Sequence, residues 1–249
     1  MSSSEVALIV GGGPGISSSC ARLFSSEGMK VAVAARNSDK PALKKLEAEH
    51  NVVLIECDAS DPGSVETMFK QTTDQLGAPR LVVHNIDGRS RDVFRKTITE
   101  VDPAPFLQTL TNSTFSAFLV GQQAARYMLE LEGIDGHRGT ILYTNASAAM
   151  KGYPKSGAFA AACHGKAGLA QSMARELMPQ GIHVAQIPID AAIGRRQEDG
   201  TRAHWLAGET KDDNMADPDR IADVYLQIHR QHKSTWTFEV ILRPWTENW

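Results

Sequence analysis

Cysteine is scarce in this chain: its 249 residues include three, at Cys20, Cys57 and Cys163. Thiols so few and so far apart exclude a disulfide framework, and their spacing matches no zinc-binding motif. We therefore predict no metal site, and we expect the three thiols to be reduced and buried in an intracellular protein.

Long hydrophobic runs and blocks of like charge are also missing. No apolar stretch approaches the roughly 18 residues that a membrane-spanning helix needs, and the opening residues MSSSEVALIVGGGPG lack the basic start and apolar middle of a signal peptide. The net charge is −3 and no Lys/Arg block is present, which argues against a nucleic-acid surface. These absences predict a cytoplasmic protein that has neither a membrane nor a nucleic acid as its partner.

What the chain does contain is an alternation of short apolar segments and amphipathic ones. Continuous Val/Ile/Leu segments separated by helices on short loops are typical of a parallel sheet covered on both faces. The sequence therefore predicts a single α/β domain over residues 1–249, with a Rossmann-type doubly wound parallel sheet of about seven strands and helices on both faces. A long helix is predicted from about Ala104 to Leu131, and TWTFEVILR is predicted as the last strand.

The first predicted strand is followed by a glycine-rich loop, VGGGPGIS. Gly11, Gly13 and Gly15 lie between that strand and a helix that begins near Ile16, in the pattern G-x-x-x-G-x-S. Such a loop brings backbone N–H groups against a pyrophosphate at the positive end of the helix. For the glycines alone, a tight structural turn is the alternative interpretation.

Polar residues follow the next three predicted strands. Arg36 comes after the second strand, where an arginine accommodates the 2′-phosphate of a nucleotide. Asp58, with Ala59 beside it, follows the third strand and is placed to reach an adenine ring. Asn85 follows the fourth strand, at the carboxyl edge where open sheets bind ligands. Together with the glycine loop, these residues predict an NADP(H) site.

In this order, the loop and its polar partners resemble the short-chain dehydrogenase/reductase superfamily over nearly the whole chain. The superfamily's T-G-x-x-x-G-x-G motif matches VGGGPGIS, its adenine-site Asp matches Asp58, and its N-N-A-G motif keeps Asn85 in HNID. The resemblance implies an oxidoreductase that uses NADP(H), because members with an arginine at the position of Arg36 generally do. It also implies a small-molecule substrate and assembly into a homodimer or homotetramer.

In that superfamily a Ser, a Tyr and a Lys carry out the proton chemistry, and an Asn completes a proton relay. The register of GLAQSMAREL places Phe159 at the Tyr position, Cys163 at the Lys position and Ala146 at the Ser position. The relay Asn falls at Ser113, with Asn112 adjacent. The resemblance thus implies that the standard proton chemistry is absent, and that Ala146, Phe159 and Cys163 line the substrate pocket.

Other residues are candidates to compensate for this loss. Lys166 shares a helix face with Phe159 but lies about 10 Å further along the axis, so we expect a solvated lysine. Asp190 aligns with the superfamily's Pro-Gly pair beside the nicotinamide; it either faces the reacting centre with a raised pKa or makes a local loop hydrogen bond. Tyr153, on the loop that borders the same pocket, is a candidate proton donor or stacking surface. Cys163 is expected to be a buried packing residue rather than a nucleophile.

The missing proton donor decides which reactions remain. A positioned general acid contributes roughly 10²–10⁴-fold, and an ordinary ketone needs it, whereas an iminium or similarly activated acceptor does not. We therefore predict an atypical NADP(H)-dependent reductase of a precharged or activated C=N or C=C bond, with Asp190 paired to an iminium-like cation and secondary metabolism as one setting. A non-redox cyclase or isomerase of cycloaddition type, and a catalytically dead cofactor-binding protein, remain as alternatives.

Overall fold

The computed structural model describes residues 4–196, 201–204, 208–209 and 214–247. Strands and helices alternate along the chain, as the apolar pattern predicts. The strands are β1 (Val6–Val10), β2 (Lys30–Ala35), β3 (Val53–Glu56), β4 (Leu81–His84), β5 (Gly139–Ala146), β6 (Ile182–Ile189), β7 (Arg195–Arg196), β8 (Arg202–His204) and β9 (Gly208–Glu209). The α-helices are α1 (Ile16–Ser26), α2 (Pro41–His50), α3 (Pro62–Leu76), α4 (Pro103–Leu110), α5 (Ser116–Leu129), α6 (Gly157–Leu177) and α7 (Pro218–His229).

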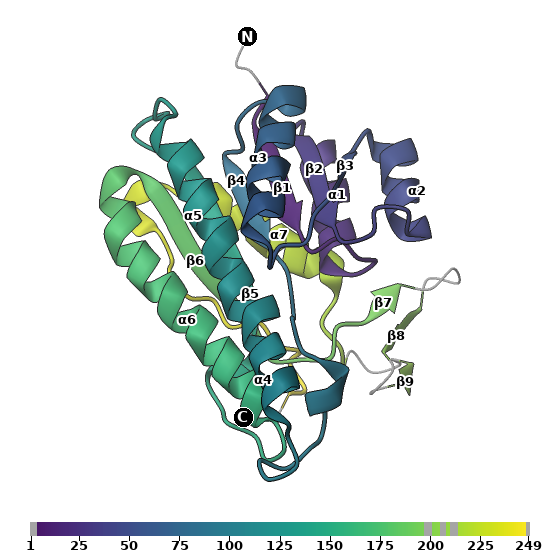
Figure 1. The fold of residues 1–249 in the computed structure, drawn as a ribbon. Helices are drawn as coiled ribbons and strands as arrows, with labels where there is room; N and C mark the ends of the chain where they lie inside the picture. Colours follow the sequence, from purple (N-terminus) through teal and green to yellow (C-terminus); the bar gives the residue numbers. More distant parts are fainter. Residues whose placement is uncertain (1–3, 197–200, 205–207, 210–213, 248–249) are drawn as a thin grey trace.

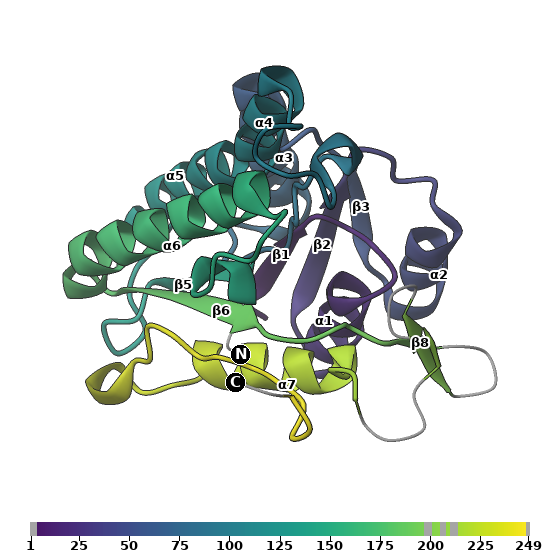
Figure 2. The same cartoon turned by 90° about the horizontal axis from the view of Figure 1, so that it is seen from below.

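The main sheet has six strands in the order β3-β2-β1-β4-β5-β6, and every neighbouring pair is parallel. Helices α3, α5 and α6 cover one face, and α1, α2 and α7 cover the other (Figures 1 and 2). This arrangement confirms the predicted doubly wound α/β fold. The chain builds outward from β1 to β3 and then returns to β4 on the other side of β1, so the strand order reverses between β1 and β4.

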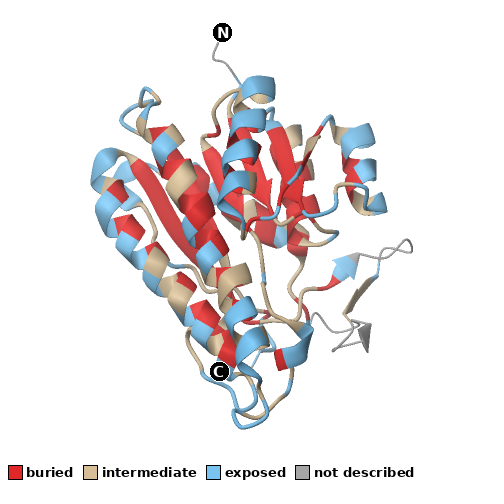
Figure 3. Cartoon of the chain, in the orientation of Figure 1, coloured by how far each residue is buried: buried red, intermediate tan, exposed pale blue. Residues whose placement is uncertain are grey.

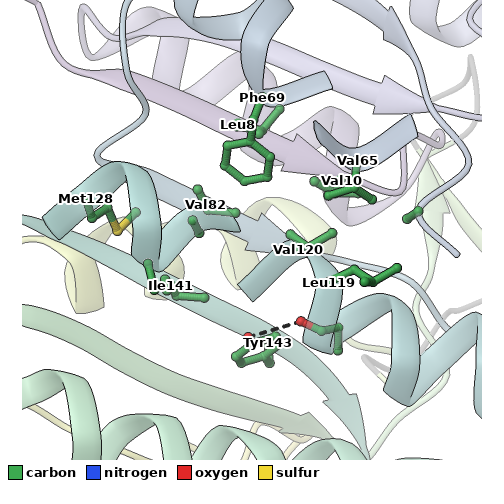
Figure 4. Close-up of a cluster of buried hydrophobic side chains, with 14 of the residues drawn as sticks. Leu8, Val10, Val65, Phe69, Val82, Leu119, Val120, Met128, Ile141 and Tyr143 are labelled. Atoms are coloured by element: carbon green, nitrogen blue, oxygen red, sulfur yellow. Dashed lines mark hydrogen bonds between the residues drawn. The ribbon is translucent and has the colours of Figure 1, made fainter. Parts of the chain in front are cut away.

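Both faces of the sheet are buried, which is why its strands read as continuous apolar runs rather than as alternating ones. On β1, Leu8 and Val10 pack into the cluster under α3 and α5, while Ala7 and Ile9 pack into the cluster over α1 and α7. Figure 3 shows the strands buried along their length. Figure 4 shows the first cluster, in which the Tyr143 hydroxyl donates to the Ala117 carbonyl over 3.3 Å.

The long helix predicted from about Ala104 to Leu131 is divided in two. Helices α4 and α5 are joined by a π-helical turn over Thr111–Phe115. The Ser116 hydroxyl donates to the carbonyls of Asn112 and Ser113, at 2.6 and 3.1 Å, and such side-chain bonds to the backbone compete with regular helical ones. The turn fixes α6 as well, because the Thr114 hydroxyl donates to a carbonyl of that helix over 2.8 Å.

The predicted last strand, TWTFEVILR, runs beside β6 but is not a regular strand. Its backbone bonds reach β6 at two isolated bridges, Gln186 with Glu239 and Ile189 with Leu242. Between these bridges lies Pro188, which accepts from Leu242 N over 3.0 Å but has no N–H to donate. The proline therefore interrupts the ladder, and the main sheet has six regular strands with a seventh segment along its edge.

A second, small sheet follows β6. Its three strands, β7, β8 and β9, are antiparallel, and Figure 1 shows it beside the main body below α2. Among the residues that the structure describes, no helix is both long and apolar enough to cross a membrane.

Close packing of α5 on β5 gives a direct test of this fold. A Cβ built on Gly121 would overlap the Tyr143 hydroxyl, whereas one built on Gly168, in α6, would meet no atom within 4 Å. We expect Gly121→Ala to lower the free energy of unfolding by about 1–3 kcal/mol through overpacking, and Gly168→Ala to raise it by about 0.5–1 kcal/mol through helix propensity. Denaturant unfolding measures both. Equal effects of the two substitutions, or no recovery of Gly121→Ala by Tyr143→Phe, would contradict the packing described here.

Candidate active site

Two cavities lie at the carboxyl edge of the sheet, where the strand order reverses. The larger, which we call the reaction-side cavity, has a volume of about 410 Å³ and reaches from the glycine loop to α6. The smaller, which we call the adenosine-side cavity, has a volume of about 280 Å³ and is bounded by the loops after β2 and β3. The two share the loop after β4, because Asn85, Ile86, Asp87 and Arg89 line both. One elongated ligand can therefore occupy both cavities.

The glycine loop is fastened to the end of β4 by a short chain of hydrogen bonds. The Asn85 amide donates to the Ser17 hydroxyl over 2.7 Å, and that hydroxyl donates to the Gly11 carbonyl over 2.7 Å. Gly11 has a φ of +105°, and a Cβ there would overlap the Asn85 carbonyl, so a residue with a side chain does not fit. Gly11 is therefore needed for the close approach of its backbone to that of Asn85.

Further along the same loop the backbone faces open space. A Cβ on Gly13 or Gly15 would meet no atom within 4 Å, and both glycines line the reaction-side cavity together with Ile16. Helix α1 begins at Ile16, and no side chain caps its first N–H groups. Uncapped N–H groups at the positive end of a helix favour an anion such as a pyrophosphate.

The adenosine-side cavity brings together the residues predicted after β2 and β3. Arg36, Asp58 and Ala59 all line it, as does Gly11. The hydroxyl and backbone N–H of Ser60 donate to the Asp58 carboxylate over 2.7 and 3.0 Å. These bonds, helped by the Arg36 charge, lower the pKa of Asp58 and keep it ionised. The cavity thus contains the Arg36 cation, on the loop after β2, and the fixed Asp58 carboxylate, on the loop after β3.

Three of the predicted pocket residues form the wall of the reaction-side cavity. Ala146 ends β5, while Phe159 and Cys163 lie on the first turns of α6, and all three line the cavity. The Arg89 guanidinium covers the Phe159 ring at 3.8 Å from its centroid, a cation–π contact that holds both side chains at the mouth. Among the described residues that line this cavity there is no tyrosine. Its wall therefore lacks a phenolic proton donor.

Cys163 is a packing residue in this wall. Its side chain is buried with Ala148 and Phe159, and that burial raises the pKa of its thiol to about 11. Its carbonyl accepts from the Asn145 amide over 3.0 Å, and the same amide donates to Gln186 on β6. These contacts tie α6 to the ends of β5 and β6 and agree with the predicted structural role of the thiol.

The expectation that Lys166 is solvated is wrong. Its side chain is only 2% exposed, and its Nζ donates to the carbonyls of Ile86, over 2.8 Å, and Thr144, over 3.3 Å. The distance between Phe159 and Lys166 along α6 did not predict this burial, because the Lys166 side chain extends toward the carboxyl ends of β4 and β5. Lys166 lines the reaction-side cavity and places a cation at its floor.

Asp190 and Tyr153, the two predicted catalytic residues, are not brought into this cavity. Asp190 is buried, but its carboxylate accepts from Lys151 Nζ over 3.2 Å. Its neighbours Ile189 and Ala191 line the cavity, and Asp190 does not. This alternation follows from extended backbone, in which successive side chains point to opposite sides. Tyr153 is 45% exposed on the loop before α6 and lines none of the cavities described here.

Two basic residues that no sequence motif indicated also line the reaction-side cavity. Arg195 comes from β7 and His204 from β8. Burial lowers the pKa of His204, with a smaller contribution from Arg195. Asp87 is the one acidic residue among the described lining residues, and it pairs with Arg89 over 3.4 Å. The described lining therefore carries more positive than negative charge.

Within the described part of the chain, no group of three or more His, Cys, Asp or Glu side chains is arranged to hold a metal ion. The predicted thiols are all free and buried.

The family is decided by comparison with known proteins. Residues 11–242 match a family model described as enoyl-(acyl carrier protein) reductase. The 3-oxoacyl-[acyl-carrier-protein] reductase MabA of Mycobacterium avium is 31% identical over 206 residues, which is 82% of this chain and 74% of that protein. The chain belongs to the short-chain dehydrogenase/reductase superfamily. It is therefore a member of a family of oxidoreductases that bind a nicotinamide cofactor.

Two further relatives of this short-chain dehydrogenase/reductase bear on its site. A short-chain dehydrogenase from Rhodopseudomonas palustris has a solved structure with a TM-score of 0.77 and 29% identity, covering 98% of this chain and 100% of that one. The (+)-cis,trans-nepetalactol synthase NEPS2 of Nepeta racemosa is 27% identical over 185 residues, 74% of this chain and 68% of that protein. The superfamily thus includes relatives of this chain that are named as reductases, dehydrogenases and synthases.

The residues present fit a dinucleotide. The open backbone at Gly13 and Gly15 has room for a pyrophosphate, and Asn85 lies where the two cavities meet. These positions leave the side of Arg36 and Asp58 and the side of Phe159 for the two halves of such a ligand.

The buried thiol gives the first functional test. Because the pKa of Cys163 is raised to about 11, we expect its alkylation by iodoacetamide at pH 8 to be roughly a hundredfold slower than that of an exposed thiol. Peptide mass spectrometry measures the rate, with the urea-unfolded protein as the control in which all three cysteines react. Rapid labelling of Cys163 in the native protein would show an activated nucleophile instead.

The placement of Asp190 gives a second functional test. Lys151→Met leaves the buried Asp190 carboxylate without its cation, so we expect a lower Tm, recovered in part when Asp190→Asn is added. We expect Asp190→Asn alone to leave NADPH affinity unchanged, because its side chain does not line the cavity. Thermal unfolding and calorimetric titration measure these effects. Loss of turnover in Asp190→Asn at an unchanged Tm would place Asp190 in the reacting centre after all.

Proposed function

We propose that this protein is an atypical NADP(H)-dependent reductase that transfers a hydride to an activated acceptor without a tyrosine proton donor. One observation carries the proposal: the cavity that begins at the open glycine backbone ends at a wall of Ala146, Phe159 and Cys163. These residues stand where the resemblance to the superfamily expects its Ser, Tyr and Lys. The cofactor, when bound, supplies the hydride; the wall supplies no hydroxyl to protonate the product.

The preference for NADP(H) over NAD(H) rests on charge. Arg36 and Lys40 both line the adenosine-side cavity, and a guanidinium after β2 suits a 2′-phosphate where an acidic residue suits a free ribose. The carboxylates in that cavity, Asp58 and Asp87, follow β3 and β4 rather than β2. An NADP(H) site at Gly11, Gly13, Gly15, Ile16, Arg36, Asp58, Ala59 and Asn85 is therefore part of the proposal.

The charge in the cavity favours one of the two kinds of acceptor. An iminium was predicted to pair with Asp190, but that carboxylate is held by Lys151 outside the cavity lining. The floor and mouth instead present Lys166 and Arg89. Hydride addition to a C=C bond conjugated to a carbonyl gives an enolate, and such cations stabilise the negative charge on its oxygen. Water then supplies the proton that the enolate carbon takes up. We therefore favour an activated C=C acceptor, with an iminium as the secondary candidate.

A second function is favoured by two relatives. The nepetalactol synthases of Nepeta racemosa are named as synthases rather than as dehydrogenases. A cavity with an apolar wall that holds a reactive substrate also accelerates cyclisation or isomerisation by fixing its geometry and excluding water. Under this alternative, product forms while NADPH absorbance stays constant.

Other predictions accompany the proposal unchanged. A small-molecule substrate fits the volume of about 410 Å³, within the range of ligand pockets. A homodimer or homotetramer, and a cytoplasmic location, remain predictions from the resemblance and the composition. A catalytically dead cofactor-binding protein is the outcome if NADPH binds and no acceptor turns over.

The reaction is tested by following NADPH absorbance with a panel of acceptors. We expect α,β-unsaturated ketones and acids to be reduced, cyclic iminium ions to be reduced more slowly, and saturated ketones to be reduced at least about a hundredfold more slowly than the conjugated ones. Reduction of saturated ketones as fast as conjugated ones would contradict the proposal, because it requires the proton donor that the wall lacks.

The cofactor preference is tested at Arg36. Because a charge-assisted hydrogen bond contributes about 1.5–3 kcal/mol, we expect Arg36→Ala to weaken NADPH binding roughly tenfold or more and to leave NADH binding unchanged. Arg126→Ala, an exposed substitution on α5, is the matched control and should change neither. Equal losses for NADPH and NADH in Arg36→Ala would show that Arg36 does not read the 2′-phosphate.

A further inference from the structure

The floor of the reaction-side cavity is built around one buried ammonium. Lys166 lies three residues after Cys163 on α6, and its Nζ bridges the loop after β4 and the end of β5 through the carbonyls of Ile86 and Thr144. An ammonium has three N–H donors, and these two bonds use two of them. The third is left for the cavity that Lys166 lines.

The charge of this ammonium is not neutralised by the protein around it. Within the described residues Lys166 forms no salt bridge, and its direct hydrogen-bond partners are neutral carbonyls. The titratable groups that face it are His84 on β4, Asp87 on the loop after β4, and Cys163 on its own helix. Burial lowers the pKa of Lys166 to about 8, and the nearby Cys163 and Asp87 oppose that change. The pKa of His84 is lowered mainly by burial, with a further contribution from the Lys166 charge. A buried cation without a counter-ion is costly to retain, which points to a ligand that completes its contacts.

We propose that Lys166 is the positioning cation of the reaction-side cavity, donating its remaining N–H to a ribose hydroxyl of the bound nicotinamide nucleotide. Lys166 then makes the ribose contact that the resemblance assigns to the position of Cys163. It does so from about one helical turn further along α6. This inference rests on the proposed NADP(H) binding.

The assignment couples cofactor binding to a proton. The ammonium donates this bond better than the neutral amine does, so binding raises the pKa of Lys166 above its free value of about 8. Affinity for NADPH is therefore greatest below about pH 8 and falls as the pH rises through the free pKa. Between the free and bound values, binding takes up a fraction of a proton. The 2′-phosphate does not mimic this effect, because phosphate monoesters lose their second proton near about pH 6.

The experiment is calorimetric titration of the wild-type protein with NADPH from about pH 7 to about pH 9.5, in pairs of buffers with different ionisation enthalpies. The pH range brackets the Lys166 pKa. We expect proton uptake that peaks above about pH 8, with affinity falling over the same range. Binding without proton uptake and without a change of affinity overturns the inference and leaves the proposed function standing. No binding of NADPH at any pH overturns both.

Substitutions assign the effect to Lys166. We expect Lys166→Met to weaken NADPH binding roughly tenfold or more and to remove the proton uptake, while Lys70→Met, at an exposed lysine of α3, changes neither. Adding Cys163→Lys to Lys166→Met returns a lysine to the position of the superfamily's own, and we expect it to recover affinity. Unchanged affinity and proton uptake in a folded Lys166→Met overturn the inference. If Lys166→Met does not fold, the wild-type proton uptake decides alone.

Discussion

The contact between Gly11 and Asn85 is the constraint on which the rest of the site depends. It joins the ends of β1 and β4 at the point where the strand order reverses, and a hydroxyl and an amide lock it through Ser17. Because the chain leaves β1 and β4 toward opposite sides of this point, the loops diverge and leave room between them. The two cavities meet there for that reason, and together they have room for one elongated ligand across the Gly11–Asn85 contact.

Charge is divided between the inside and the outside of the site. The buried carboxylate nearest to the reaction-side cavity, Asp190, is held by Lys151 and faces away from it, whereas Arg89 and Lys166 face in. A cavity of this kind suits a substrate that becomes negative as it reacts rather than one that arrives positive. Phe159 does not donate a proton, but it provides the ring on which Arg89 is stacked. The proposed chemistry thus depends on fixed cations where related enzymes use a hydroxyl.

The residues predicted for the cofactor all line the two cavities and the two predicted catalytic residues do not, for a physical reason. Arg36, Asp58 and Asn85 directly follow strands, and parallel strands bring their carboxyl ends to one edge. The burial of Lys166 was not predicted because its partners are backbone carbonyls near the ends of β4 and β5. These carbonyls are far from Lys166 in sequence, and no side chain marks them as its partners. Two other features of the structure did have a signal in the sequence. Side chains alternate along extended backbone, so Asp190 points away from the side of Ile189 and Ala191. Pro188 cannot donate a ladder hydrogen bond, so it indicates a break in the pairing at the edge of β6. The strands β7 and β8, which supply Arg195 and His204, are too short to show a period.

A crystal structure of the protein with NADP⁺ tests the central claim most directly. The account predicts a dinucleotide that spans both cavities, with its 2′-phosphate at Arg36, its pyrophosphate over Gly13 and Gly15, and its nicotinamide beside the wall of Ala146, Phe159 and Cys163. A complex in which the nicotinamide half lies outside the reaction-side cavity, with Phe159 and Arg89 closed across its place, would contradict hydride transfer at this wall. It would leave a fold that retains a nucleotide for purposes other than reduction.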